Sequence, residues 1–346
     1  MKVRSILAPV AIAALLATSV AACGSDSSAS TDKPRVIATT TILGDLVSQV
    51  AGDSVDVEVL MPPGADPHEF EASVAQAARI RSASLVVANG LGLEERLEGT
   101  LDAAQADGVT VYEVGPEIDP LPMKEESEEH SEAEVGAEAE GHDHDHEEAG
   151  PEVAVAAEAE AEGHDHGEFD PHFWLDPDRM AMAAGLVATQ LANATGLDPA
   201  PFQERAARYA ADAIAAGQEA DAILAAVPAD QRLLVTNHDA LGYFARRFNL
   251  TVLGTVIPGG STLAEPSAAD ISAIADALAA TDVNAVFSEN TVSPRLVEAV
   301  AAEVGRNIIV VELFTDSLGD PGSGADTYAG LITTDATLVA NGLLGR

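Results

Sequence analysis

Short runs of β-branched residues alternate with amphipathic helical stretches along most of this chain, and this alternation constrains its fold more than any other feature. Before residue 117 the strand-like runs are 35–40, 55–61, 85–89 and 109–114. The helical patterns between them are 42–50, 74–81 and 93–104. Strands and helices in alternation build βαβ units, whose parallel sheet is covered by helices on both faces. We therefore predict an α/β fold.

The same alternation returns in the second half of the chain, after a long helical pattern. Its strand-like runs are 232–236, 252–256, 285–288 and 308–312, and its helical patterns are 241–248, 268–280, 294–304 and 328–344. The long pattern begins at Asp198-Pro199, ends before Pro228 and contains few large apolar residues among many alanines. Such a helix is typical of a connection between domains. We expect lobes at 34–196 and 229–346, with a linker helix at 197–228.

Residues 117–169 interrupt the alternation. The segment is rich in Glu, Asp, Ala, Gly and His, and the pattern of residues 137–144 is repeated at 159–166. It has almost no large apolar side chain whose burial could offset the entropy of ordering. We therefore predict a disordered, acidic, His-rich insertion within the first lobe.

The first residues have the order of a secretory signal peptide, with a basic segment at 1–4 and an apolar stretch at 6–20. The apolar stretch is too short to span a bilayer comfortably. Val20-Ala21-Ala22-Cys23 resembles a bacterial lipobox, in which the cysteine is lipidated and becomes the new N-terminus. We expect a signal peptide at 1–22, a lipid-anchored tether at 23–33, and export to the outer face of the cytoplasmic membrane. The alternative is an ordinary signal peptide with a coincidental cysteine.

The formal net charge of −40 limits the possible partners. Nucleic acids and anionic lipids repel an acidic surface, so we expect no nucleic-acid partner and no membrane contact except through the anchor. A cationic ligand fits this charge. The chain also lacks a Walker A loop, a Gly-x-Ser-x-Gly elbow and a His-Glu-x-x-His helix.

Outside the insertion the chain has only three histidines, His68, His172 and His238, each in a loop beside a predicted element. Ligands of open α/β sheets bind at the carboxyl ends of strands, so these imidazoles could converge in the cleft between the lobes. Neutral imidazole suits zinc, copper, iron and nickel, and zinc prefers four ligands in a tetrahedron. The alternative is that each histidine caps a loop or fills a polar gap.

A fourth ligand is expected from the loop that follows the last strand of the second lobe. Asp316 is our candidate because it comes directly after that strand. Asp320 and Asp326 lie in the same Gly-rich loop and remain alternatives. Since the ligands must lose protons to bind a metal, the affinity should fall as the pH drops towards about 6.

Five segments carry a specific resemblance: 63–68, 170–177, 237–238, 265–267 and 316–317. With these segments in this order, the chain resembles the cluster A-I (cluster 9) substrate-binding proteins of metal ABC transporters. The resemblance implies two (β/α)4 lobes with parallel sheets, a long rigid helix between them, and a metal in the inter-lobe cleft. It also implies a monomeric, non-enzymatic protein that delivers its metal to an ABC permease, with a metallochaperone as a further candidate partner.

The third ligand position of this family reflects the metal. Manganese-type members tend to place a carboxylate there and zinc-type members a histidine, and this chain has His238. Three nitrogen ligands favour zinc over manganese, which prefers oxygen-rich sets. We therefore expect Zn²⁺ as the transported ligand, with manganese or another transition metal as the alternative.

Zinc-type relatives often carry a His-rich loop between the first two ligand segments, where this insertion falls. Six histidines flanked by acidic residues could bind metal there weakly: His130, His142, His144, His146, His164 and His166. The alternative is a solvated acidic loop with no needed role in transport. Two other functions stay open: an exported zinc hydrolase with Asp239 or Glu69 as general base, and a surface adhesin as a second activity.

Overall fold

The computed structural model describes residues 33–123, 168–257, 259–264 and 266–346. The predicted signal peptide, Cys23, the six histidines of the insertion and Glu265 lie outside the described residues. Among the helices that are described, none combines the length and the apolar character that a membrane crossing requires.

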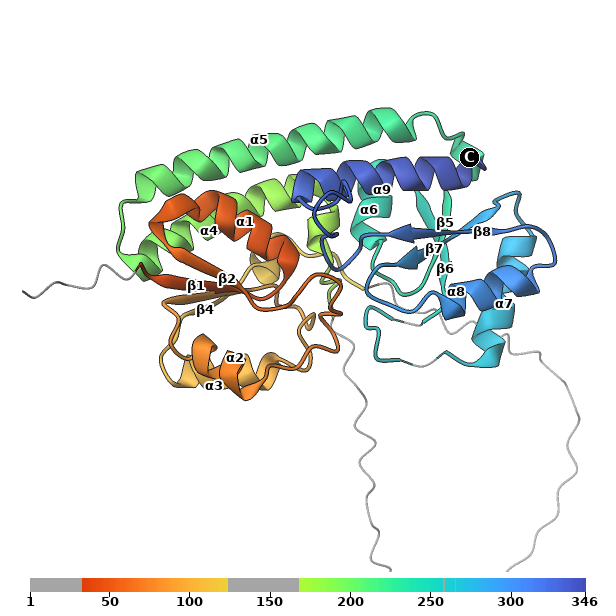
Figure 1. The fold of residues 1–346 in the computed structure, drawn as a ribbon. Helices are drawn as coiled ribbons and strands as arrows, with labels where there is room; N and C mark the ends of the chain where they lie inside the picture. The colour runs from red at the N-terminus through yellow and green to blue at the C-terminus, as the bar shows by residue number, and fades with distance from the viewer. Residues whose placement is uncertain (1–32, 124–167, 258, 265) are drawn as a thin grey trace, which may run out of the picture. The chain divides into compact units, whose positions relative to one another are not determined.

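The first lobe is built on a four-stranded parallel sheet in the order β2-β1-β3-β4. Its strands are β1 (Arg35–Ala38), β2 (Asp56–Val59), β3 (Leu85–Ala88) and β4 (Val111–Glu113). Its helices are α1 (Thr41–Ala51), α2 (Val74–Ile80) and α3 (Glu98–Ala106), with short 3-10 helices at Gly52–Ser54 and Gly115–Glu117. Figure 1 shows α1 on one face of the sheet and α2 and α3 on the other. The predicted parallel α/β architecture is confirmed.

The strand sequences explain this layering. Side chains alternate between the two faces of a strand. In β1, Val36 and Ala38 join the core beneath α1, whereas Ile37 joins the second apolar cluster with Ile80 and Leu101 of the opposite helices. Both faces of the strand are therefore buried, as a continuous β-branched run predicts.

The second lobe has two parallel two-stranded ladders, β5-β6 and β7-β8. The strands are β5 (Leu233–Thr236), β6 (Thr251–Thr255), β7 (Ala285–Glu289) and β8 (Ile309–Leu313). The helices are α6 (Gly242–Phe248), α7 (Ala268–Ala279), α8 (Arg295–Glu303) and α9 (Tyr328–Leu343), with a 3-10 helix at Ala229–Gln231. Because β5 lies beside β7, the four predicted strands of this lobe are present and adjacent.

Two long helices, α4 (Pro177–Thr195) and α5 (Pro199–Leu224), stand between the two sets of strands in sequence. Asp176 and Asp198 cap their N-termini, each followed by a proline at the first helical position, and Gly196 ends α4 in the left-handed conformation. α5 is about 39 Å long at 1.5 Å per residue. It packs against α1 and α4 of the first lobe and against α6 and α9 of the second (Figure 1).

Two stretches differ from their predicted structure. The helix expected over 93–104 begins only at Glu98, because Gly90, Leu91 and Gly92 have positive φ and the buried Glu94 carboxylate accepts hydrogen bonds from the backbone of Asn89 and Gly90. The expected insertion 117–169 is also folded at both of its ends. There Ile118 is fully buried and Pro122 forms an antiparallel bridge with Phe169.

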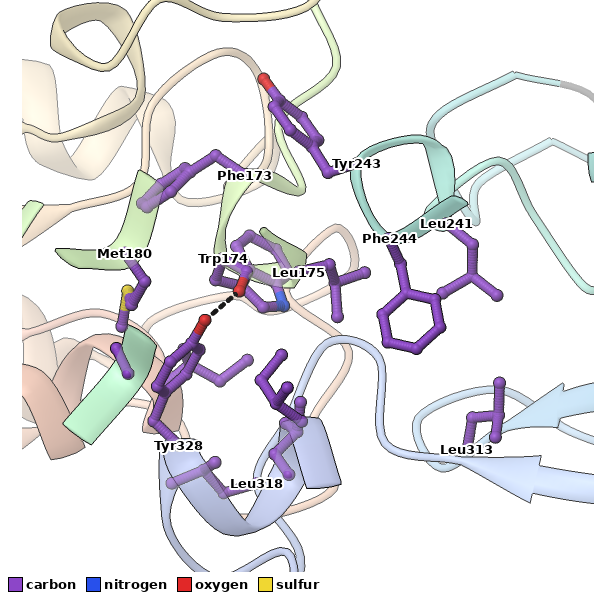
Figure 2. Close-up of a cluster of buried hydrophobic side chains, with 14 of the residues drawn as sticks. Phe173, Trp174, Leu175, Met180, Leu241, Tyr243, Phe244, Leu313, Leu318 and Tyr328 are labelled. Carbon is purple, nitrogen blue, oxygen red and sulfur yellow. Dashed lines mark hydrogen bonds between the residues drawn. The ribbon is translucent and has the colours of Figure 1, made fainter. Parts of the chain in front are cut away.

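An apolar cluster contains residues of both lobes (Figure 2). Trp174, in the 3-10 helix Phe173–Leu175, donates its indole N–H to the carbonyl of Thr315 at 2.7 Å. Tyr328 at the start of α9 donates its hydroxyl to the carbonyl of Trp174 at 2.8 Å. Both bonds are buried and connect residues of different lobes, so this cluster holds the loops of the two lobes together.

Candidate metal centre

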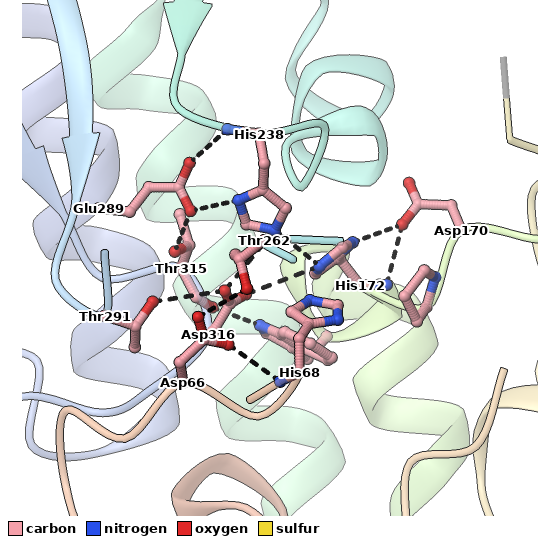
Figure 3. A network of polar contacts seen from close by, with 12 residues as sticks. Asp66, His68, Asp170, His172, His238, Thr262, Glu289, Thr291, Thr315 and Asp316 are labelled. Carbon is pink, nitrogen blue, oxygen red and sulfur yellow. Dashed lines mark hydrogen bonds and ion pairs between the residues drawn. The ribbon is translucent and has the colours of Figure 1, made fainter. Parts of the chain in front are cut away.

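Four side chains from four separate loops converge in the structure. His68 follows β2, His172 precedes the 3-10 helix before α4, His238 follows β5, and Asp316 follows β8. One possible ligand atom from each lies within 4.8 Å of those of the other three. Figure 3 shows the three imidazoles and the Asp316 carboxylate facing one another. All four residues are at most 2% exposed.

Two of the histidines stand in the same local structure. In Asp66-Pro67-His68 and in Asp170-Pro171-His172, Oδ1 of the aspartate accepts the backbone N–H of the histidine two residues later at 2.9 Å. This is the Asx turn that an Asp-Pro sequence favours. The two turns hold the backbone of both imidazoles in the same way, although the segments are more than 100 residues apart.

A carboxylate lies near Nδ1 of each of the three rings. Oδ1 of Asp170 is 2.8 Å from Nδ1 of His172, and Oε2 of Glu289 is 2.6 Å from Nδ1 of His238. Glu95 is more distant, with Oε1 3.7 Å from Nδ1 of His68. A carboxylate on Nδ1 favours the tautomer whose Nε2 is free to bind a metal. His172 and His238 are thus oriented as metal ligands require.

The inner distances suit a tetrahedral ion. Nε2 of His172 and Nε2 of His238 are 3.2 Å apart, and each is 3.7 Å from an oxygen of Asp316. Bond lengths of about 2.0–2.1 Å in a zinc tetrahedron put neighbouring ligand atoms about 3.4 Å apart. His172, His238 and Asp316 therefore have nearly the spacing of a first coordination shell, although the two 3.7 Å distances end at different oxygens of Asp316.

Hydrogen bonding leaves some of these atoms without a partner. Nε2 of His68 and Oδ1 of Asp316 are buried and have no hydrogen-bond partner among the described residues. Unpaired polar atoms are rare in protein interiors because each costs roughly 1–3 kcal/mol. A cation held among the four side chains would satisfy both atoms.

The surroundings shift the pKa values of the titratable groups at this site in different directions. Burial and the neighbouring His238 and His68 hold the pKa of His172 well below its usual range. Burial alone would also lower the pKa of His238, but Glu289 and Asp316 raise it to about 10. Burial raises the pKa of Asp316 to about 6, against the opposing effect of His238. His238 is therefore the ring on which these groups hold a proton.

Hydrogen bonds between the lobes fix the loops that carry the ligands. Oγ of Ser317, next to Asp316, accepts the backbone N–H of Gly64 at 2.8 Å and lies 3.2 Å from Oγ1 of Thr41. Thr262 of the second lobe also donates its hydroxyl to Oδ2 of Asp66 at 2.7 Å. The His68 loop of the first lobe is thus tied both to the Asp316 loop and to Thr262 of the second lobe.

The structure separates the predicted metal ligands from the alternative carboxylates. It brings together the four predicted ligands His68, His172, His238 and Asp316, and it leaves the alternatives Asp320 and Asp326 exposed. The accessory histidines His130, His142, His144, His146, His164 and His166 lie outside the described residues.

The sequence interpretation missed Glu289, Thr315 and Ser317. A signal for Glu289 was available, since it follows the predicted strand 285–288 directly and so stands at a carboxyl end, where ligands of α/β folds gather. The contact between Glu289 and His238 depends on how the β5-β6 and β7-β8 ladders pack together, and no local sequence pattern encodes that packing.

Comparisons with known proteins agree with this architecture. A profile of the family described as ZnuA, zinc-uptake complex component A periplasmic, matches residues 36–342. The chain is 29% identical over 331 residues to the zinc-binding protein TroA of Treponema pallidum, covering 92% of this chain and 91% of that protein. It is 28% identical over 340 residues to the manganese-binding lipoprotein MntA of Bacillus subtilis, covering 96% and 97%.

A solved structure has the same fold. The periplasmic zinc-binding protein TroA of Treponema pallidum matches with a TM-score of 0.72 and 26% sequence identity, over 90% of this chain and 99% of that chain. The prediction of two α/β lobes with parallel sheets is thereby confirmed.

Proposed function

We propose that this chain, which belongs to the family of the periplasmic zinc-uptake complex component A, captures a transition-metal ion outside the cytoplasm and delivers it to an ABC importer. Members of that family are solute-binding proteins of ABC importers and not enzymes. The alternative of a zinc hydrolase with Asp239 or Glu69 as general base is therefore set aside.

One observation carries the proposal: four potential ligand atoms from two lobes lie within 4.8 Å of one another in a fully buried position. Four protein ligands close a tetrahedral site, whereas catalytic zinc keeps one position open for water or substrate. The arrangement therefore suits capture and release of the ion. We assign His68, His172, His238 and Asp316 as the ligands.

The donor set favours zinc as the ion. Three imidazole nitrogens and a single carboxylate are a typical zinc environment, while manganese prefers mostly oxygen ligands. The relatives divide on this point, because TroA is named a zinc-binding protein and MntA a manganese-binding lipoprotein. His238 as third ligand is the feature that supports zinc for this chain.

The remaining parts of the proposal concern location and partners. A lipidated Cys23 would anchor the protein to the outer face of the cytoplasmic membrane, in keeping with relatives that are named lipoproteins. There it would act as a monomer, receive zinc directly or from a metallochaperone, and pass it to an ABC permease. The six histidines of the insertion would bind zinc weakly as an accessory site.

The test is a competition titration of residues 24–346 with zinc and manganese, beside a variant that lacks residues 124–167. The ends of this segment are suitable for a short Gly-Ser replacement, because the backbone N–H of Met123 bonds to the carbonyl of Glu168 at 3.0 Å. We expect one tight zinc site in both proteins and no displacement of zinc by equimolar manganese. Preferential manganese binding would contradict the zinc assignment, and loss of tight binding with the segment would contradict the proposed centre.

A further inference from the structure

Glu289 contacts both the backbone and the ring of His238. This glutamate ends β7 and is 2% exposed. Its Oε1 accepts the backbone N–H of His238 at 3.0 Å, while its Oε2 accepts the hydroxyl of Thr315 at 3.1 Å. Oε2 is also the atom 2.6 Å from Nδ1 of His238. Glu289 therefore uses one oxygen for the backbone of His238 and the other for its ring (Figure 3).

The contact with the ring is short but not aligned as an ideal hydrogen bond, so Nδ1 of His238 has no well-directed partner in this geometry. The short distance between Oε2 and Nδ1 decides the pairing, and the imperfect alignment does not. The χ2 torsion of histidine is soft, and a small rotation of the ring points Nδ1–H at Oε2.

Asp170 holds His172 in a different way. Its Oδ1 alone contacts both the backbone N–H of His172, at 2.9 Å, and Nδ1 of the ring, at 2.8 Å. The second oxygen of Asp170 faces a pocket of about 220 Å³ that Asp239 and Arg246 also line. Glu289 thus orients His238 with both of its oxygens, whereas Asp170 orients His172 with only one.

We propose that Glu289 is a positioning residue for metal binding, which keeps the proton of His238 on Nδ1 and leaves Nε2 free for the ion. The inference rests on the proposed function, because it concerns how that centre holds its ligand. It assigns to Glu289 a role that depends on both of its oxygens being acceptors.

Replacing Glu289 by glutamine would reverse the tautomer of His238. The backbone N–H of His238 is a fixed donor, so the amide oxygen must face it. The amide NH2 then faces Nδ1 and donates to it, which places the ring proton on Nε2, the nitrogen needed by the metal. Restoring Nε2 as a ligand would set two donors against each other in a buried position, which is costly.

Replacing Asp170 by asparagine has no such consequence. An amide oxygen at the position of Oδ1 still accepts both the backbone N–H and Nδ1–H of His172. The NH2 group then takes the position of Oδ2, near the carboxylate of Asp239. Both substitutions replace a carboxyl group by an amide of the same shape beside a ligand histidine, so loss of the carboxyl group alone predicts similar effects on zinc affinity.

The experiment compares the zinc affinity of the wild-type protein, Glu289→Gln and Asp170→Asn by competition with a chelator. We expect Glu289→Gln to bind zinc about 10–100-fold more weakly, the usual effect of losing an outer-shell partner. We expect Asp170→Asn to lose less than about fivefold, because its hydrogen bonds become neutral but remain. Equal losses in the two variants would overturn the inference.

A second readout is independent of whether Glu289→Gln folds. Histidine-selective ¹⁵N spectra of the zinc-loaded wild-type protein should show the proton of His238 on Nδ1, the nitrogen that faces Glu289, and the metal on Nε2. In folded, metal-free Glu289→Gln the Nδ1 of His238 should carry no proton, because the amide NH2 donates to it. A His238 that carries its proton on Nε2 in the zinc-loaded wild type would overturn the inference. A wild-type protein with no zinc site at all would overturn the proposed function and this inference with it.

Discussion

Nε2 of His172 lies 3.2 Å from Nε2 of His238, although the two residues belong to different lobes and are 66 positions apart. Two imidazole nitrogens this close must share a cation or a proton, because two lone pairs repel and two N–H groups clash. The surrounding charges place the proton on His238, whose pKa Glu289 and Asp316 raise to about 10 although burial opposes this. A metal ion that binds between the rings would take the place of that proton.

Zinc binding should therefore weaken as the pH falls. A group whose pKa is about 10 keeps its proton throughout the range from pH 8 to pH 6, so each zinc ion must displace one proton from His238. One displaced proton weakens the apparent affinity by about tenfold per pH unit. Competition titrations at pH 6, 7 and 8, corrected for the chelator's own protonation, measure this slope. An affinity that does not change with pH would contradict the account.

Removal of any ligand should abolish tight binding. Structural zinc sites are worth about 10–16 kcal/mol over four ligands, so each accounts for roughly 2.5–4 kcal/mol. We expect His68→Ala, His172→Ala and Asp316→Ala each to lower the zinc affinity by about 100-fold or more. Asp320→Ala is the matched control, since this exposed aspartate lies in the same loop as Asp316. A similar loss in Asp320→Ala would show that loop disturbance, and not ligation, lowers the affinity.

The Ser317 hydroxyl should contribute to zinc affinity without touching the metal. Its contacts with Gly64 and Thr41 tie the Asp316 loop to the first lobe. Loss of a hydrogen bond of this kind costs about 0.5–1.5 kcal/mol, so Ser317→Ala should bind zinc roughly 2–10-fold more weakly. In Ser323→Ala the lost hydroxyl bonds only within its own loop, to the N–H of Ala325, and the affinity should be unchanged.

Asp335 on α9 should make stability depend on pH. Burial raises its pKa well above the usual range, and one of its oxygens has no hydrogen-bond partner among the described residues. Because the neutral form is favoured in the folded state, the stabilisation is complete below the unfolded pKa of about 3.9 and is lost as the pH rises through the folded pKa. Asp335→Asn does not titrate and should keep the bond to the N–H of Phe314.

Urea unfolding of the wild-type protein and Asp335→Asn at pH 5 and pH 8 tests this prediction. The free energy of unfolding of the variant should rise relative to the wild type as the pH increases. Each pH unit between the unfolded and the folded pKa of Asp335 adds at most about 1.4 kcal/mol to the difference in unfolding free energy between the two proteins. The prediction is wrong if the difference between the two proteins is the same at both pH values.

Local signals in the sequence were sufficient for most of the fold. Asp176-Pro177 and Asp198-Pro199 begin helices because they combine a capping side chain with a residue that needs no N–H donor. The stretch before α3 could not be predicted in this way. Its turns depend on the buried carboxylate of Glu94, which bonds to the backbone of Asn89 and Gly90 and to the hydroxyl of Thr39, a residue distant in sequence.

The candidate metal centre could be predicted as far as residue types alone indicate its chemistry. Histidines are rare outside the insertion, and each of the three stands beside a turn or a strand end. The residues that orient them are common types whose roles depend on tertiary packing. Glu289 becomes significant only because β7 lies beside β5, and Ser317 only because the loop of Gly64 meets it from the other lobe.

The most direct test of the central claim is the position of the metal itself. Crystals of residues 24–346 grown with one equivalent of zinc would be measured on both sides of the zinc absorption edge. The account predicts one anomalous peak about 2 Å from Nε2 of His68, His172 and His238 and from a carboxylate oxygen of Asp316. A principal peak elsewhere in the protein, or one bound by fewer than three of these side chains, would contradict it.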